Sequence, residues 1–232
     1  TVLVSAGTYY ENLDLNSNNI TIIGEDRETT IIDGGGNGSV IKTLNNEASF
    51  NNFTIQNGYA EKGGGFSIES GANIIINNCN IINNSTFDRA SALYIHYSSL
   101  IVNNSLISGN YGDYYTIESN NSVTTINYSL ITNNSSHQHT IWSTAHINNV
   151  GIFNLNNVSM VNNNPGNGVA INYDGFYGYI KNSIISNSGI IRVIQVDNLS
   201  VSYSSIEGGE NSIFVSSWGN DGWGTSELNW LE

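Results

Sequence analysis

The sequence is short of charge, and above all of positive charge. Charged residues make up 11% of its 232 residues, and 6 Lys and Arg stand against 19 Asp and Glu, for a formal net charge of −13. Because phosphate contacts need a basic surface, this balance argues against nucleic acid as a partner and disfavours docking on an anionic membrane. Solubility must therefore come from neutral polar groups, and 40 of the residues are Asn.

Cysteine, proline and long apolar runs are also scarce. Cys79 is the one cysteine, so an internal disulfide is excluded, and we expect a packed thiol because neighbouring repeats have Ser or Val at that place. No apolar run approaches the roughly 18 residues that span a membrane, so membrane insertion is not expected. The acidic, Lys-poor composition favours a secreted or cell-surface protein. We expect a piece of a longer secreted chain, and further domains of the same polypeptide at both ends are left open.

What the sequence has in abundance is an internal repeat of apolar residues and Asn. Motifs such as Phe50-Asn51-Asn52, Ile76-Asn77-Asn78 and Val102-Asn103-Asn104 recur at spacings of 21 to 29 residues, which is typical of a solenoid. Within each unit the apolar residues alternate as in a half-buried strand, and nowhere do they recur at helical spacing. The repeat predicts an all-β chain, a right-handed single-stranded parallel β-helix of about nine coils with three short strands per coil.

The same repeat predicts a single domain over residues 1–232 and its internal layout. We expect N-terminal coils in 1–49, regular Asn-rich coils in 50–209, and a Trp- and Gly-rich coil or cap in 210–232 around Trp218, Trp223 and Trp230. Asn suits the bends because it tolerates the left-handed backbone region and can bond to its equivalent one coil away. One predicted ladder, interrupted by Tyr128 and Tyr203, consists of Asn52, Asn78, Asn104, Asn157 and Asn182. A second consists of Asn84, Asn110, Asn134 and Asn163. A predicted inward stack consists of Ile81, Ile107, Ile131, Met160, Ile185 and Ile206.

Two segments, TVLVSAGTYYENLDLNSNNITIIGEDRETTIIDGGG and INNCNIINN, resemble the secreted right-handed parallel β-helix repeat proteins of the pectate-lyase-like superfamily, in its bacterial branch. The resemblance covers nearly the whole chain and implies the fold. It implies much less about activity, because the superfamily includes lyases, hydrolases, epimerases, phage tailspikes and adhesins. Its lyases often use Asp clusters that bind calcium, and no such cluster is visible in this sequence. We therefore assign no metal ligands, and calcium is the one cofactor left open.

Candidate site residues come from the strand that precedes each Asn motif. We align these strands on Ile68, Ile95, Ile117, Ile141 and Ile171, so that the residue after each points outward. The predicted catalytic residues on this face are Glu69, His96 and Glu118, and the predicted substrate-binding residues are Tyr94, Trp142 and Asn172. Two carboxylates around an imidazole could hold a divalent cation or divide acid and base roles, and Trp142 could stack on a sugar ring. The alternative is an ordinary solvent-facing polar sheet.

Two functions remain open. The first, which the sparse charge favours, is a non-catalytic extracellular module that binds a polysaccharide or cell-surface glycan or acts as an adhesive scaffold. The alternative is a polysaccharide-active enzyme, a lyase, hydrolase or epimerase, that uses the face around Glu69, His96, Glu118 and Trp142. Arg89 lies in a turn that could overhang this face, and we expect it to form an internal ion pair or a solvated turn.

Overall fold

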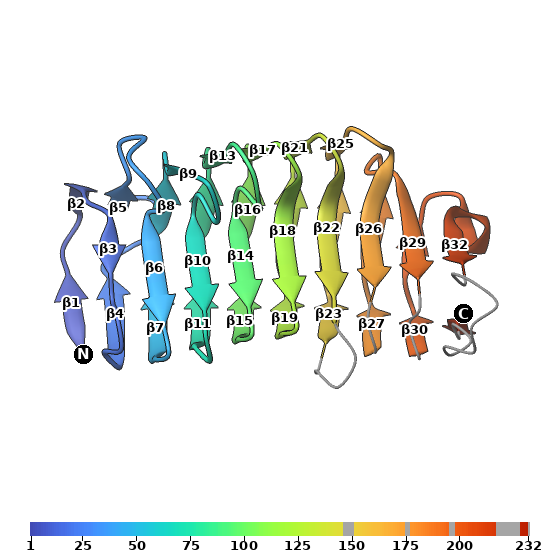
Figure 1. The fold of residues 1–232 in the computed structure, drawn as a ribbon, viewed down its shortest axis with the longest axis horizontal. Helices are drawn as coiled ribbons and strands as arrows, with labels where there is room; N and C mark the ends of the chain where they lie inside the picture. The colour runs from blue at the N-terminus through green and yellow to red at the C-terminus, as the bar shows by residue number, and fades with distance from the viewer. Residues whose placement is uncertain (146–150, 175–176, 195–197, 217–227, 232) are drawn as a thin grey trace.

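The protein is a solenoid of stacked parallel strands, seen from the side in Figure 1. The computed structural model describes residues 1–145, 151–174, 177–194, 198–216 and 228–231. Within these residues every pairing between neighbouring strands of a sheet is parallel, and the only helical element is the 3-10 helix η1 at Gly209–Ser212. No described helix has the length and apolar character needed to cross a membrane. The predicted all-β parallel β-helix is confirmed.

Two long sheets form two sides of the solenoid. Sheet A consists of β1 (Val2–Val4), β4 (Ile20–Gly24), β7 (Glu47–Asn51), β11 (Asn73–Asn77), β15 (Ser99–Asn103), β19 (Val123–Asn127), β23 (Ile152–Asn156), β27 (Tyr177–Lys181), β30 (Asn198–Ser202) and β33 (Leu228–Leu231). Sheet B consists of β2 (Gly7–Tyr10), β5 (Thr30–Asp33), β8 (Thr54–Gln56), β12 (Asn80–Ile82), β16 (Leu106–Ser108), β20 (Leu130–Thr132), β24 (Ser159–Val161), β28 (Ile184–Ser186) and β31 (Ser205–Ile206).

A third long sheet and one short sheet complete the coils. Sheet C consists of β3 (Leu13–Asp14), β6 (Ile41–Leu44), β10 (Phe66–Glu69), β14 (Leu93–His96), β18 (Tyr115–Asn120), β22 (His139–Thr144), β26 (Val169–Asp174), β29 (Ile190–Ile194) and β32 (Ile213–Ser216). Sheet D consists of β9 (Tyr59–Ala60), β13 (Ser85–Thr86), β17 (Tyr111–Gly112), β21 (Ser135–Ser136) and β25 (Asn164–Pro165).

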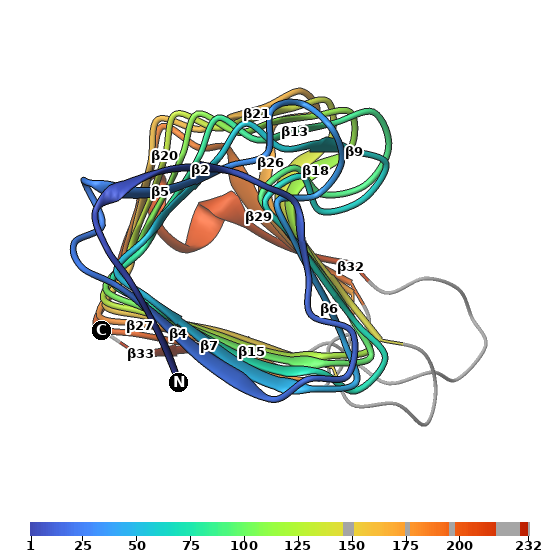
Figure 2. The same ribbon diagram turned by 90° about the vertical axis from the view of Figure 1, so that its left-hand side faces the viewer.

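Each coil runs from sheet A to sheet B to sheet C, which gives the three-sided outline of the end-on view in Figure 2. This confirms the prediction of three strands per coil. In five coils a strand of sheet D is inserted between sheets B and C, and the sequence analysis did not anticipate it. The inserted segments make the B–C corner project outward, so they can overhang the outer face of sheet C.

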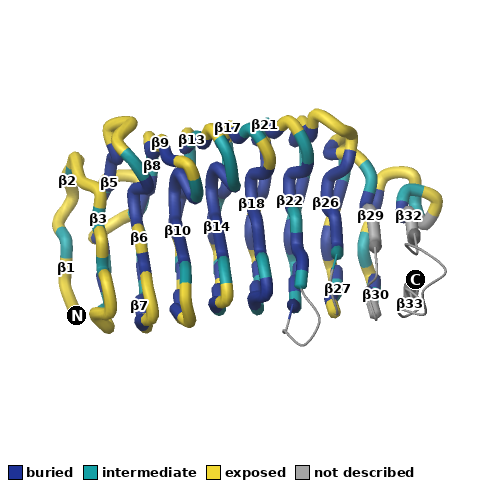
Figure 3. The backbone as a smooth tube through the Cα atoms, viewed as in Figure 1, coloured by how far each residue is buried: buried dark blue, intermediate teal, exposed yellow. Residues whose placement is uncertain are grey.

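The core is a set of apolar stacks inside the coils. The residues that are buried are drawn dark blue along the backbone in Figure 3. Strand alternation sends every second side chain inward, where its equivalents lie one strand spacing of about 4.8 Å apart. The predicted stack of sheet B is confirmed in full, since its members are paired in register and buried, and Ile32 and Ile55 extend it. Cys79 is the packed thiol that was expected, and burial raises its pKa to about 12.

The bends follow the predicted Asn positions, with one correction. Asn52 and its predicted equivalents, Tyr128 and Tyr203 included, have φ between 50° and 63°, as the left-handed conformation requires. The longest amide ladder of this bend runs one residue earlier than predicted, through Asn51, Asn77, Asn103, Asn127 and Asn156, with bonds of 2.9 to 3.4 Å. The predicted ladder from Asn84 to Asn163 is confirmed, with amide bonds of 2.9 to 3.1 Å. Of the proposed C-terminal cap, Trp218 and Trp223 lie outside the described residues.

Candidate functional site

Two rows of outward-facing residues run along sheet C, and together they contain all six residues predicted for the site. Members of a row are paired in register on neighbouring strands, about 4.8 Å apart. The first row consists of Asp14, Lys42, Ser67, Tyr94, Glu118, Trp142 and Asn172. The second row, two residues further along each strand, consists of Leu44, Glu69, His96, Asn120, Thr144 and Asp174.

The predicted alignment of β18 is wrong by two residues. Glu69 and His96 are partners as expected, but Glu118 pairs with Tyr94 instead of with His96. A shift of two residues keeps each side chain on its face, so the hydrophobic pattern cannot reveal it. Glu69 and Glu118 therefore share the outer face, but their Cα atoms lie about 12 Å apart, two strand spacings across and two residues along.

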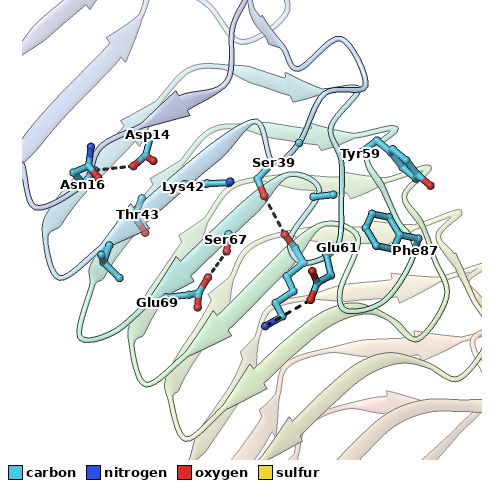
Figure 4. Close-up of a pocket in the computed structure, with 14 residues that line it drawn as sticks. Asp14, Asn16, Ser39, Lys42, Thr43, Tyr59, Glu61, Ser67, Glu69 and Phe87 are labelled. Carbon is cyan, nitrogen blue, oxygen red and sulfur yellow. Dashed lines mark hydrogen bonds and ion pairs between the residues drawn. The ribbon is translucent and has the colours of Figure 1, made fainter.

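A groove of about 550 Å³ lies on this face over β3, β6 and β10 (Figure 4). Its floor is formed by residues of both rows, and its far wall by β9 with the turn that follows it and by Phe87. The wall reaches over the sheet because the backbone approaches itself closely at glycines. A Cβ at Gly58 would lie 1.9 Å from the carbonyl oxygen of Gly64, so only glycine fits there. None of these wall residues was predicted as part of a site.

The groove is lined by positively and negatively charged side chains, which lie beside two aromatic rings. Its charged lining residues are Asp14, Lys42, Glu61, Lys62 and Glu69. The Ser67 hydroxyl donates to Glu69 Oε1 at 2.9 Å, which orients this carboxylate on the floor. On the wall, the rings of Tyr59 and Phe87 are exposed and contact each other, with centroids 5.5 Å apart. Such a lining suits a ligand that carries hydroxyl groups on flat faces.

Beyond the groove, Glu118 lies in a buried aromatic cluster on the same face. Its side chain is fully buried, and Arg89 Nη1 donates to its Oε1 at 3.0 Å. Arg89 thus forms the expected internal ion pair. Burial raises the pKa of Glu118 to about 7, although the charge of Arg89 acts in the opposite direction. The alternation of the sequence predicts an exposed Glu118. Its side chain is buried because the segments around sheet D cover this part of the sheet.

Aromatic rings enclose the Glu118–Arg89 pair. Trp142 stacks on Tyr115 at a centroid distance of 4.6 Å, and the Arg89 guanidinium lies 5.8 Å from the Trp142 ring. Tyr94 is buried next to Glu118, and burial together with the charges of Glu118 and Glu69 raises its pKa to about 12. Tyr94 therefore lies between the two glutamates that the sequence analysis had placed around His96.

The remaining predicted residues lie at the two ends of this cluster. His96 is partly exposed, and its ring contacts those of Tyr94 and Tyr97. Asn172 is buried, and its Nδ2 lies 3.3 Å from Nε2 of His139, a residue not singled out from the sequence. The face thus divides into an open groove that contains Glu69 and a closed cluster that contains Tyr94 and Glu118.

Acidic residues form no metal-binding cluster in the described part of the chain. No group of three or more His, Cys, Asp or Glu there could hold a metal ion. Asp33, in the Gly-rich turn, has a structural role. Its carboxylate accepts hydrogen bonds from the Gly35 amide and from the side chains of Gln56 and Asn57. Calcium, which the sequence left open as a cofactor, stays an untested prediction.

Comparisons with known proteins find likeness in solved structures alone. Neither family models nor curated protein sequences match the chain. A pectin methylesterase from carrot is similar over 99% of this chain and 72% of its own, at 17% identity and a TM-score of 0.47. Pectin methylesterases from Erwinia chrysanthemi and Yersinia enterocolitica are similar at 12% identity, with TM-scores of 0.43 and 0.38. They cover 99% and 94% of this chain and 83% and 89% of their own. These likenesses concern the parallel β-helix fold that the resemblance implied.

Proposed function

We propose that the chain is a polysaccharide-active β-helix protein that binds a saccharide in the groove over β3, β6 and β10 and acts on it there. The observation that carries the proposal is the groove itself. Its polar floor, with Glu69 held by Ser67, faces the exposed rings of Tyr59 and Phe87. Aromatic rings stack on sugar faces, and a fixed carboxylate within reach of a hydroxyl or a water can act as a general base.

The saccharide that fits best is uncharged or sparsely charged. The groove has three carboxylates and two lysines, and the whole chain has a formal charge of −13. A polyanionic chain would meet repulsion both at long range and along the floor. Sugar hydroxyls, in contrast, both donate and accept, and the mixed lining offers both kinds of partner.

In this proposal Glu69 is the acid–base residue of the groove, with His96 as its neighbour on the next strand. Glu118 is too deeply buried to touch a substrate in this conformation. The predicted catalytic role is thus kept for Glu69 and His96, whereas Tyr94, Trp142 and Asn172 form and border the cluster behind them. An extracellular location is part of the same proposal, because the acidic, Lys-poor composition favours a secreted or cell-surface protein.

Binding and turnover test the proposal separately. Neutral gluco-oligosaccharides and oligouronides are used as probes in calorimetry and in a product-release screen. We expect Phe87→Ala to weaken binding of the neutral probe about fivefold, because loss of a stacked ring costs on the order of 1 kcal/mol. Tyr128→Ala is the matched control, an exposed aromatic on a different corner. Glu69→Gln should keep binding and lose turnover.

The outcomes distinguish the two functions left open by the sequence. Product release that Glu69→Gln abolishes supports the enzyme. Binding in the groove without product in any screen supports the non-catalytic glycan-binding scaffold. If neither probe binds, or if Phe87→Ala and Tyr128→Ala behave alike, the groove is not a saccharide site.

A further inference from the structure

The wall of the groove is one backbone unit made from two successive coils. Strand β13 pairs with β9, which joins Ser85 and Thr86 to Tyr59 and Ala60. Further along, the Arg89 amide donates to the carbonyl of Glu61 at 2.9 Å. The Thr86 hydroxyl donates to the carbonyl of Arg89. A displacement of the Arg89 backbone would therefore also displace Phe87 and the turn after β9, which contains the groove-lining residues Glu61 and Lys62.

The side chain of Arg89 ties this unit by charge to the middle of sheet C. Its guanidinium donates to Glu118 on β18, two strands away from the groove floor at β10. The Arg89 side chain is 37% exposed, whereas Glu118 is fully buried. Among the described residues, the second carboxylate oxygen of Glu118, Oε2, has no hydrogen-bond partner. Arg89 can thus exchange its partner for water, but Glu118 cannot.

The groups that face Glu118 come from every element packed around it. Arg89 and Asp88 belong to the turn after β13, and Lys62 to the turn after β9. Tyr94 of β14 and Tyr115 of β18 itself also sense its charge, and His139 of β22 stacks on Tyr115. Among these, Arg89 is the one that donates a hydrogen bond to the carboxylate. Burial raises the pKa of Glu118 to about 7, so the pair changes its charge near neutral pH.

We propose that Glu118 is a positioning residue that fastens the wall of the groove through Arg89 when it is ionised and releases the wall when it is protonated. A neutral carboxyl group loses the charge-assisted part of the bond, and Arg89 is then free to turn toward water. The consequence for ligand affinity rests on the proposed function, because it concerns the same groove. Saccharide binding should then be stronger at mildly alkaline than at mildly acidic pH.

Amide hydrogen exchange tests the release of the wall without any ligand. Protection at Phe87 and Arg89 is compared at about pH 8 and about pH 5.5, after correction for the intrinsic pH dependence of exchange. We expect protection to fall about tenfold or more at the lower pH, since a hydrogen bond to a charged group contributes on this scale. Tyr111 and Ser135, which start β17 and β21 of the same sheet D, are internal controls whose protection should not change.

Variants separate this role from a merely structural one. Glu118→Gln should show low protection of the wall at both pH values, with no pH dependence. Arg89→Gln removes the more exposed partner of the pair and should also give low, pH-independent protection of the wall. It keeps the test possible if the Glu118 variant fails to fold. Arg27→Gln is the matched control, because Arg27 has 34% side-chain exposure and an ion pair with Glu28 elsewhere on the surface. It should behave like the wild type.

The result decides the proposal in each case. Equal wall protection at both pH values in the wild type, or an unchanged pH dependence in Glu118→Gln and Arg89→Gln, overturns it. If protection changes as expected and the neutral gluco-oligosaccharide binds about tenfold more weakly at low pH, the regulation of the groove is supported. If protection changes but no saccharide binds at any pH, the fastening of the wall stands and the proposed function fails. If the saccharide binds equally at both pH values, regulation of the groove is wrong.

Discussion

The strands of sheet D are held on their two sides in opposite ways. Toward sheet B, β13, β17, β21 and β25 each directly follow a member of the buried ladder of Asn84, Asn110, Asn134 and Asn163, in which the same residue makes the same bonds coil after coil. Toward sheet C, the first two of these strands meet residues that occur once each, among them Lys62, Arg89 and Glu118. One side is uncharged and fully repetitive, and the other is charged, aromatic and unique.

This contrast separates what stabilises the coil from what gives the molecule a particular surface. In the ladder, each amide satisfies its neighbours, so repetition alone makes a buried polar row stable. Around Glu118, in contrast, one oxygen of a buried carboxylate has no partner in the part of the chain that the structure describes, which a purely structural design would avoid. Local departures from the most consistent solution are expected where a protein has a function to perform.

The largest expected effect comes from breaking the ladder. Asn110 Oδ1 accepts from the backbone and side-chain nitrogens of Asn84, and its Nδ2 donates to the Ile81 carbonyl and to Asn134 Oδ1. Asn110→Leu removes these bonds and leaves buried partners unpaired, so we expect a loss of about 3 to 5 kcal/mol in the free energy of unfolding. Urea denaturation measures it. Asn73→Leu, at an exposed position of β11, is the control and should change stability little.

An intermediate effect is expected on the unique side, and its sign depends on pH. The pKa of Glu118 in the folded protein is about 7, above the ordinary value of 4.5, because burial disfavours the ionised form. The folded protein therefore binds this proton more tightly than the unfolded chain. The stability that Glu118 contributes is fully present below its ordinary pKa and is lost as the pH rises through about 7. Fastening the wall thus lowers the overall stability, which is typical of buried ion pairs.

Glu118→Gln imitates the protonated form at every pH and so exposes this contribution. Relative to Glu118→Gln, the free energy of unfolding of the wild type should fall by on the order of 3 kcal/mol between about pH 4.5 and pH 8. Other titrating groups are common to both proteins and cancel in the difference. Glu28→Gln, at an exposed ion pair, should give a curve parallel to that of the wild type. Parallel curves for Glu118→Gln as well would contradict the titration of Glu118 near neutral pH.

The same contrast explains which parts of the structure could be predicted from the sequence. Where equivalent residues recur at a regular spacing, that spacing fixes which residues pair on neighbouring strands. The stack around Ile131 and the ladder through Asn134 could therefore be predicted from spacing alone. The two-residue error at β18 arose where the repeat offers two equivalent inward residues, Leu93 and Ile95, to pair with Ile117. Only the length of the preceding turn decides between them, and periodicity says nothing about it.

The groove was out of reach for a related reason. Its wall comes from segments inserted between sheets B and C, and Tyr59 and Phe87 stand at positions that the repeat does not define. Glu69 was identified because it lies on a strand, next to an inward residue of the pattern. Lys62 could have been suspected from the scarcity of basic residues, but nothing in the sequence indicates that its turn folds back over Tyr94.

The smallest expected effect concerns Tyr128, which interrupts the row of Asn residues at the bend after sheet A. It tests whether this departure from the repeat contributes to stability or to binding. Tyr128 takes the place of Asn in the bend after sheet A, with a φ of 51° and 61% exposure. Its equivalents Asn104 and Asn157 have φ values of 52° and 55°. A left-handed backbone costs a bulky residue more than it costs Asn, so Tyr128→Asn should stabilise the protein by about 1 kcal/mol.

Tyr177→Asn is the control: this exposed tyrosine of β27 lies in a strand, where Tyr is favoured, so the change should slightly destabilise. Thermal and urea unfolding measure both, and saccharide binding should remain unchanged in Tyr128→Asn because the residue lies away from the groove. A loss of stability in that variant would mean that the tyrosine contributes a contact which outweighs its backbone strain, and unique residues would then stabilise the repetitive side as well.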